Sequence, residues 1–121
     1  MHLDEISEFN DENIWYYAIR LRNAFIVLIT DDATGKPAFG NVAVSAPARI
    51  SGKPIISSSF PFISPKYEVL GKSMAEIIGK KLKSPVILHL DVKFEPTDVT
   101  IIKAMKLALN DFCKKIVEEN Q

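Results

Sequence analysis

The sequence predicts an α+β domain in which a mainly antiparallel sheet of five or six strands carries two helices packed on one face. Two observations lead to this class. Short runs of aromatic and β-branched residues fill the first half of the chain, and two segments with helical spacing follow, separated by one further strand. The expected order is (β)ββββαβα. The 121 residues fit one domain, 1–121, and a hydrophobic content of 47% suffices for a core.

The strands are predicted from residue type and alternation. Residues 1–12 are acidic and polar, so we expect either an edge strand around Ile6–Phe9 or a frayed end. The dipeptide Arg22-Asn23 is expected to form a two-residue hairpin turn, because asparagine tolerates positive φ. Short connections between the early strands favour antiparallel meanders. The predicted strands are Ile14–Ile19, Ala24–Thr30, Phe39–Ala46, Ile55–Phe60 and Val86–Val92.

Two helices are predicted from apolar residues that recur every three or four positions. The first runs from about Tyr67 to Lys83 and ends before Ser84-Pro85, because the residue before a proline disfavours α geometry. Within it, Gly79 is expected to allow close approach to the sheet. The second begins at Pro96-Thr97-Asp98, where Thr97 or Asp98 can cap the free amides. Its apolar stripe consists of Ile101, Ile102, Met105, Leu109, Phe112 and Ile116.

The first two long strands carry apolar side chains on both faces, although only one face can meet the helices. Leaving the other face in water would expose apolar area at about 25 cal/mol per Å², and large exposed apolar patches usually mark interaction surfaces. We therefore expect a protein partner, in the simplest case a second copy. The alternative is that loops or the N-terminal segment cover this face. The expected dimer face consists of Trp15, Tyr17, Ile19, Phe25 and Val27.

Charge and cysteine content narrow the range of possible partners and cellular compartments. Fifteen basic residues balance fifteen acidic ones, so no net field would collect nucleic acid or an anionic membrane, and neither partner is expected. The apolar runs are shorter than the roughly 20 residues that cross a bilayer. Cys113 is the only cysteine and lies in an apolar helical pattern, which predicts a buried, inert thiol. A chain with one thiol suits a reducing compartment, so a cytoplasmic location is expected.

Motifs for catalysis or cofactor binding are incomplete. Gly71-Lys72-Ser73 is reminiscent of a phosphate-binding loop, but Lys66 stands where that motif needs its first glycine. His89 and Asp91 share a strand face and could orient a general base, yet no nucleophile is evident. The segment Asp31–Gly35 lacks the ligand alternation of a calcium loop. We therefore expect no enzyme activity, no cofactor and no metal site.

The order of several segments resembles the small eukaryotic proteasome assembly chaperones of the chaperone 3 and chaperone 4 type, and chaperone 4 most closely. The resemblance spans Ile14–Glu118. The segments that carry it are the hairpin Trp15–Asp31, then Asn41–Ala46, Pro54–Ser59, Leu70–Leu82, Lys83-Ser84-Pro85 and Val86–Leu90.

The resemblance implies a sheet-plus-helices domain that forms a homodimer or pairs with a sister chaperone. It further implies a non-enzymatic assembly chaperone that binds proteasome α subunits transiently while their ring assembles. Two alternatives stay open. One is a generic protein-interaction scaffold module of the profilin or roadblock-like kind. The other is a nucleotide-binding protein that uses Gly71-Lys72-Ser73.

Overall fold

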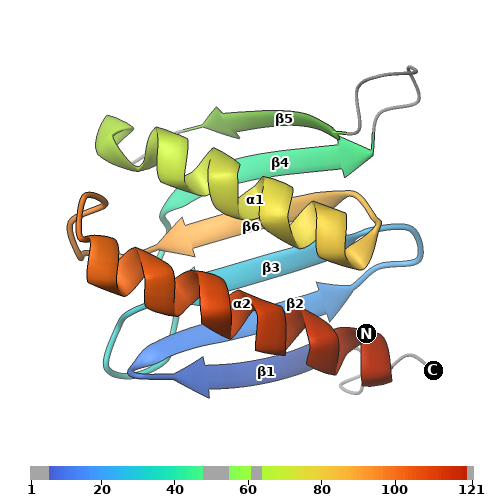
Figure 1. Ribbon diagram of the computed structural model, residues 1–121, viewed down its shortest axis with the longest axis horizontal. Coiled ribbons are helices and arrows are strands. Elements are labelled where there is room, and N and C mark those ends of the chain that lie inside the picture. The colour runs from blue at the N-terminus through green and yellow to red at the C-terminus, as the bar shows by residue number, and fades with distance from the viewer. Residues whose placement is uncertain (1–5, 48–54, 61–63, 120–121) are drawn as a thin grey trace.

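The described residues form a six-stranded sheet with two helices, which confirms the predicted α+β class (Figure 1). The computed structural model describes residues 6–47, 55–60 and 64–119. A short 3-10 turn at Pro65–Tyr67 leads into the first helix. The elements in chain order are β1 (Ile6–Asp11), β2 (Ile14–Arg20), β3 (Phe25–Thr30), β4 (Asn41–Pro47), β5 (Ile55–Phe60), α1 (Glu68–Leu82), β6 (Val86–Asp91) and α2 (Val99–Glu119).

The strand order in the sheet is β1-β2-β3-β6-β4-β5. All neighbouring pairs are antiparallel except β3 and β6, which are parallel. The prediction that the early strands form a continuous antiparallel meander is therefore wrong at one step. β3 and β4 are not neighbours, because β6 lies between them. The segment 31–40, hereafter the 31–40 connection, is long enough to cross the roughly 10 Å that two strand spacings require.

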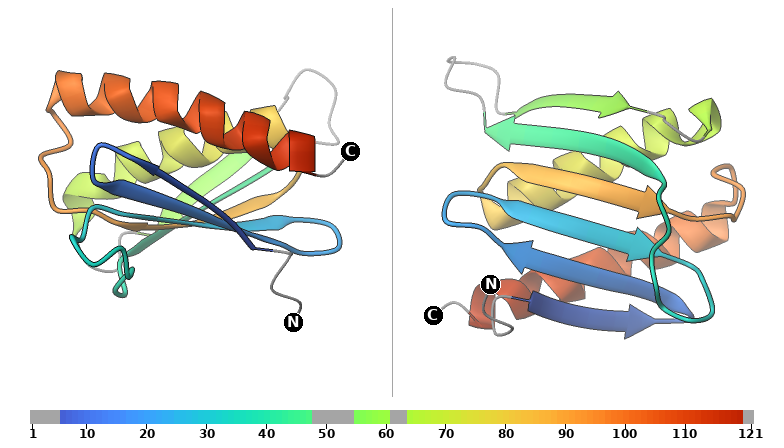
Figure 2. Two further views of the ribbon diagram at one scale, coloured as in Figure 1. Left: turned by 90° about the horizontal axis from the view of Figure 1, so that it is seen from below. Right: turned by 180° about the vertical axis from the view of Figure 1, so that it is seen from behind.

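Both helices lie on the same face of the sheet, and no helix among the described residues covers the opposite face (Figure 2). The core forms between the helices and the inward side chains of the strands. The stripe predicted for α2 is confirmed, since Met105, Leu109, Phe112 and Ile116 are fully or nearly fully buried. Phe112 packs beside the ring of Tyr16 at a centroid distance of 5.8 Å.

Tight turns join the first three strands. The amide of Leu21 donates to the carbonyl of Ala24 at 2.8 Å, which confirms a turn at Arg22-Asn23, although neither residue adopts positive φ. The turn between β1 and β2 was not predicted from the sequence. There Glu12 and Asn13 have φ of 47° and 67°, as a two-residue hairpin of the primed type requires. β1 is therefore an edge strand of the sheet. An edge strand was one of the two structures expected for residues 1–12.

Gly79 lets α1 lie close to β4. A β-carbon at Gly79 would stand 2.6 Å from the hydroxyl oxygen of Ser45. The expectation of close approach at this glycine is confirmed.

Candidate protein-interaction surface

The helix-free face of the sheet is predominantly apolar, and we call it the open face. Because side chains alternate along a strand, every second residue of β2, β3, β4 and β6 points toward this face. The alternating burial along these strands identifies which residues these are. Among the described outward residues of these four strands, the one acidic side chain is Asp91, at one end of β6, and none is a lysine or an arginine. Ile87, the second residue of the central strand β6, has 42% of its surface exposed. The apolar members are Trp15, Tyr17, Ile19, Ile26, Leu28, Val42, Val44 and Ile87.

Three of the five residues expected at a dimer face, Trp15, Tyr17 and Ile19, point to the open face. The other two, Phe25 and Val27, are 5% and 0% exposed beneath the helices, so this part of the expectation is corrected. The reason is strand register. Directly opposed residues in an antiparallel pair share a face. Ile19 is opposite Ile26 and Tyr17 is opposite Leu28, which places Phe25 and Val27 on the other face.

The 31–40 connection covers one end of the open face. The Tyr17 hydroxyl donates to the Gly35 carbonyl at 2.5 Å, and the Trp15 and Tyr17 rings stack 6.5 Å apart. Gly35 has φ of 72°, and a β-carbon there would lie 3.0 Å from the Trp15 ring. The alternative that loops cover the apolar set thus holds in part for Trp15 and Tyr17, which are both half-buried. It does not hold for Ile87, which stays exposed.

His89 and Asp91 fasten the 31–40 connection to the sheet. A carboxylate oxygen of Asp91 accepts from the Thr30 hydroxyl at 3.0 Å and from the Ala38 amide at 2.9 Å. His89 Nε2 accepts from the Gly40 amide at 2.8 Å. The connection is packed so tightly here that a β-carbon at Gly40 would lie 2.4 Å from the Leu90 carbonyl oxygen. The pair therefore has a structural role on this face.

His89 is expected to make the free energy of unfolding depend on pH in mild acid. Burial lowers the pKa of His89, and the nearby Asp91 opposes that shift. Because Nε2 accepts the Gly40 hydrogen bond, the folded protein holds the neutral ring, and protonation breaks the bond. The contribution to stability is thus complete above the unfolded-state pKa of about 6.5 and is lost as pH falls through the lower folded-state value.

We expect the free energy of unfolding, measured by urea titration, to fall between pH 7.5 and pH 5. His89→Gln keeps an acceptor for the Gly40 amide and should flatten that dependence. Parallel pH dependences for the two proteins would contradict this role of His89.

The other candidate sites have structural roles. Gly71-Lys72-Ser73 lies inside α1 and not in a loop before a helix. Gly71 is buried, and a β-carbon on it would stand 3.5 Å from that of Ala43. Asp32 accepts from the Thr34 amide at 2.9 Å, which is a turn contact. Burial raises the pKa of the Cys113 thiol to about 11, so the thiol stays protonated at neutral pH.

The described residues offer neither a metal-binding cluster nor a membrane-spanning helix. They contain no group of three or more histidine, cysteine, aspartate or glutamate side chains that could hold a metal ion. Across residues 6–47, 55–60 and 64–119, neither helix combines the length and the hydropathy that crossing a bilayer requires.

Comparisons with protein-family models and with curated proteins returned no match to this sequence. The open face is therefore the feature from which a function has to be inferred.

Proposed function

We propose that the chain is a non-enzymatic protein-interaction domain that dimerises through the open face and acts in the cytoplasm as an assembly chaperone for proteasome α subunits. The observation that carries the dimer is the exposed Ile87 among uncharged apolar neighbours on central strands. The client is inferred from the segment order shared with the small proteasome assembly chaperones.

A second copy suits the open face because the apolar middle of the face can meet itself without bringing like charges together. In a two-fold dimer, the apolar side chains of one open face would lie against those of its partner. Removing these side chains from water contributes about 25 cal/mol per Å² of apolar surface.

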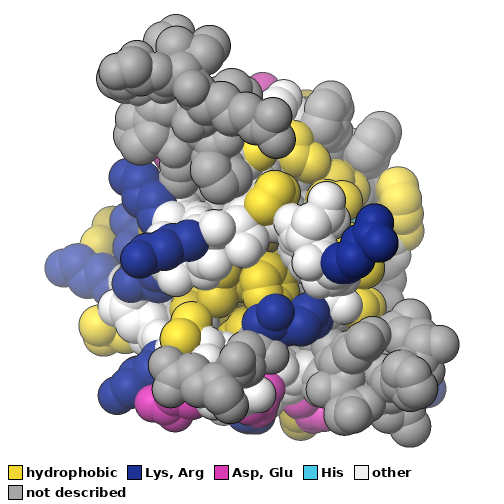
Figure 3. Space-filling view, turned by 90° about the vertical axis from the view of Figure 1, so that its right-hand side faces the viewer, with side chains coloured by type: hydrophobic (Ala, Val, Ile, Leu, Met, Phe, Trp, Pro, Cys, Tyr) yellow, Lys and Arg dark blue, Asp and Glu magenta, His cyan; other side chains and the backbone are white. Residues whose placement is uncertain are grey.

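The charges at the two ends of the sheet also favour a second copy. One end is basic, and Figure 3 shows lysine and arginine side chains around apolar surface there. The opposite end is acidic. A two-fold axis that runs across the strands places the basic end of one protomer over the acidic end of its partner. The basic end carries Arg20, Arg22, Lys80, Lys81 and Lys83 beside the acidic Glu118 and Glu119, and the acidic end carries Glu12, Asp31, Asp32, Glu95 and Asp98 beside Lys36, Lys66 and Lys93, of which Lys66 is paired with Glu95.

This dimer leaves the helix layer of each protomer on the outside. A client subunit can then contact the helices while the sheets stay paired. Such binding is transient when the client surface is itself buried at a later assembly step, because ring closure then displaces the chaperone.

Mixing the purified chain with purified proteasome α subunits from the same organism tests the client. We expect the chain to comigrate with free α subunits or partial rings on native gels and to be absent from completed proteasomes. Failure to bind any α subunit, with the dimer intact, would remove the chaperone role and favour a generic scaffold module.

A further inference from the structure

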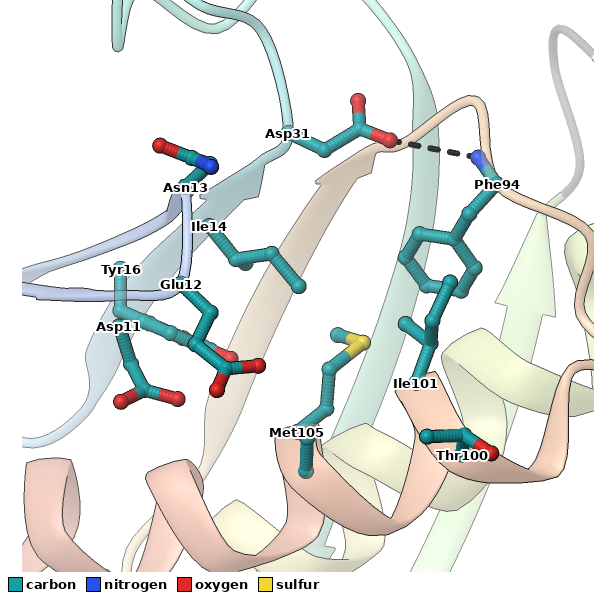
Figure 4. Close-up of a pocket in the computed structure, with 11 residues that line it drawn as sticks. Asp11, Glu12, Asn13, Ile14, Tyr16, Asp31, Phe94, Thr100, Ile101 and Met105 are labelled. Atoms are coloured by element: carbon teal, nitrogen blue, oxygen red, sulfur yellow. Dashed lines mark hydrogen bonds between the residues drawn. The ribbon is translucent and has the colours of Figure 1, made fainter.

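A cavity of about 240 Å³ opens at the acidic end of the molecule (Figure 4). It lies on the helix side of the sheet, away from the open face. The β1–β2 turn, the end of β3, the segment after β6 and the first turns of α2 enclose it. The lining residues are Asp11, Glu12, Asn13, Ile14, Tyr16, Asp31, Phe94, Thr100, Ile101, Ala104 and Met105.

Three carboxylates line this cavity, those of Asp11, Glu12 and Asp31, and no basic side chain does among the described lining residues. None of the three forms an ion pair with another described residue. Asp31 is held in place, since one of its oxygens accepts from the Lys93 and Phe94 amides at 2.8 and 3.2 Å. The cavity therefore has an acidic rim, with no basic side chain among its described lining residues.

The Tyr16 hydroxyl is a second, independent sign of a ligand. Tyr16 is 0% exposed, and its hydroxyl has no hydrogen-bond partner among the described residues. Figure 4 shows the side chain reaching from β2 toward the space between Glu12 and Met105. Burial, and secondarily Asp11, raises the pKa of Tyr16, so the hydroxyl stays protonated and can still accept a hydrogen bond. Buried polar atoms without a partner are rare in native proteins.

The remaining wall is apolar and comes from Ile14, Phe94, Ile101 and Met105. At about 240 Å³ the cavity is smaller than the roughly 300 to 1,000 Å³ of typical ligand pockets, so it suits one short chain better than a nucleotide. A ligand with a short alkyl stem and a cationic head matches the apolar wall and the acidic rim.

We propose that this cavity binds a primary alkylammonium group. The alkyl stem lies against Ile101 and Met105, and the ammonium donates to the Tyr16 hydroxyl and to the carboxylates of Asp11 and Glu12. The same chemistry is available from a free alkylamine and from a lysine side chain of a partner protein. This site is independent of dimerisation through the open face.

Calorimetric titration with n-butylammonium and with N-acetyl-lysine amide tests the proposal and separates the two sources. We expect n-butylammonium to bind and n-butanol, its uncharged counterpart, not to bind. Binding of N-acetyl-lysine amide as well would assign the cavity to a lysine side chain. Binding of n-butylammonium alone would assign it to free amines. No heat from either ammonium compound at tens of millimolar, or equal binding of n-butanol, would overturn the proposal.

Three variants locate the binding. Tyr16→Phe keeps the ring and removes the hydroxyl, so we expect the fold to persist and the affinity to fall about tenfold, as for the loss of one hydrogen bond to a charged group. The double variant Asp11→Asn with Glu12→Gln should abolish measurable binding. Glu8→Gln changes a carboxylate on β1 outside the cavity and should leave binding unchanged. Unaltered affinity in Tyr16→Phe would place the ligand elsewhere.

Discussion

Replacing Ile87 by aspartate is expected to separate the dimer into monomers that remain folded. Ile87 is 42% exposed on the central strand β6, so the substitution places a carboxylate on the open face without opening the core. Each protomer contributes one substituted residue to a two-fold interface, so the interface contains two new charges. Burying an unpaired charge costs several kcal/mol. We expect the dimer dissociation constant, measured by sedimentation equilibrium, to rise at least about a hundredfold.

Leu107→Asp is the matched control for this substitution. Leu107 is 67% exposed on α2, in the layer that the proposed dimer leaves free. The control introduces the same charge and should keep the dissociation constant within a factor of about two. Equal weakening by both substitutions, or an unchanged dimer in Ile87→Asp with circular dichroism that shows a folded protein, would place the interface elsewhere.

Replacing Phe112 by alanine is expected to have the largest effect on stability. Phe112 is 0% exposed, and its ring lies 5.8 Å from that of Tyr16 and 6.1 Å from that of Phe9. The side chain thus joins α2 to β1 and β2, and its loss leaves a cavity that the sheet cannot close. We expect the free energy of unfolding, measured by urea titration, to fall by about 3–5 kcal/mol. That is a large part of the 5–15 kcal/mol of a typical domain.

Leu107→Ala serves as the control here, because it truncates a large side chain on the same helix at an exposed position. It should change the free energy of unfolding by less than about 0.5 kcal/mol. A loss below 1 kcal/mol in Phe112→Ala would mean that α2 contributes little to the core.

Most of the fold could be predicted from local sequence patterns. The apolar stripe of α2 repeats over many turns, so its buried residues from Met105 to Ile116 could be predicted. Gly79 was likewise identified, because a glycine within an apolar helical stripe indicates close packing. The insertion of β6 between β3 and β4 was missed, because strand order is set by contacts between segments far apart in sequence and not by local pattern.

The composition of the open face was only partly predicted. A turn at Arg22-Asn23 already places Ile19 opposite Ile26, so the register needed to exclude Phe25 and Val27 was available from the sequence. The packing of the 31–40 connection over Trp15 could not be predicted from the sequence, because this connection is held in place by contacts with Tyr17 and His89. The cavity at Tyr16 was also missed, since the segments that enclose it are distant in sequence and their carboxylates form no motif.

The most direct test of dimerisation through the open face is an isotope-filtered NMR experiment on a mixture of labelled and unlabelled chains, which detects only contacts between protomers. The open-face dimer predicts contacts from the Ile87 methyl groups to apolar open-face side chains of the partner. Contacts that arise only from helix residues such as Leu107, or a complete absence of contacts between protomers, would contradict it.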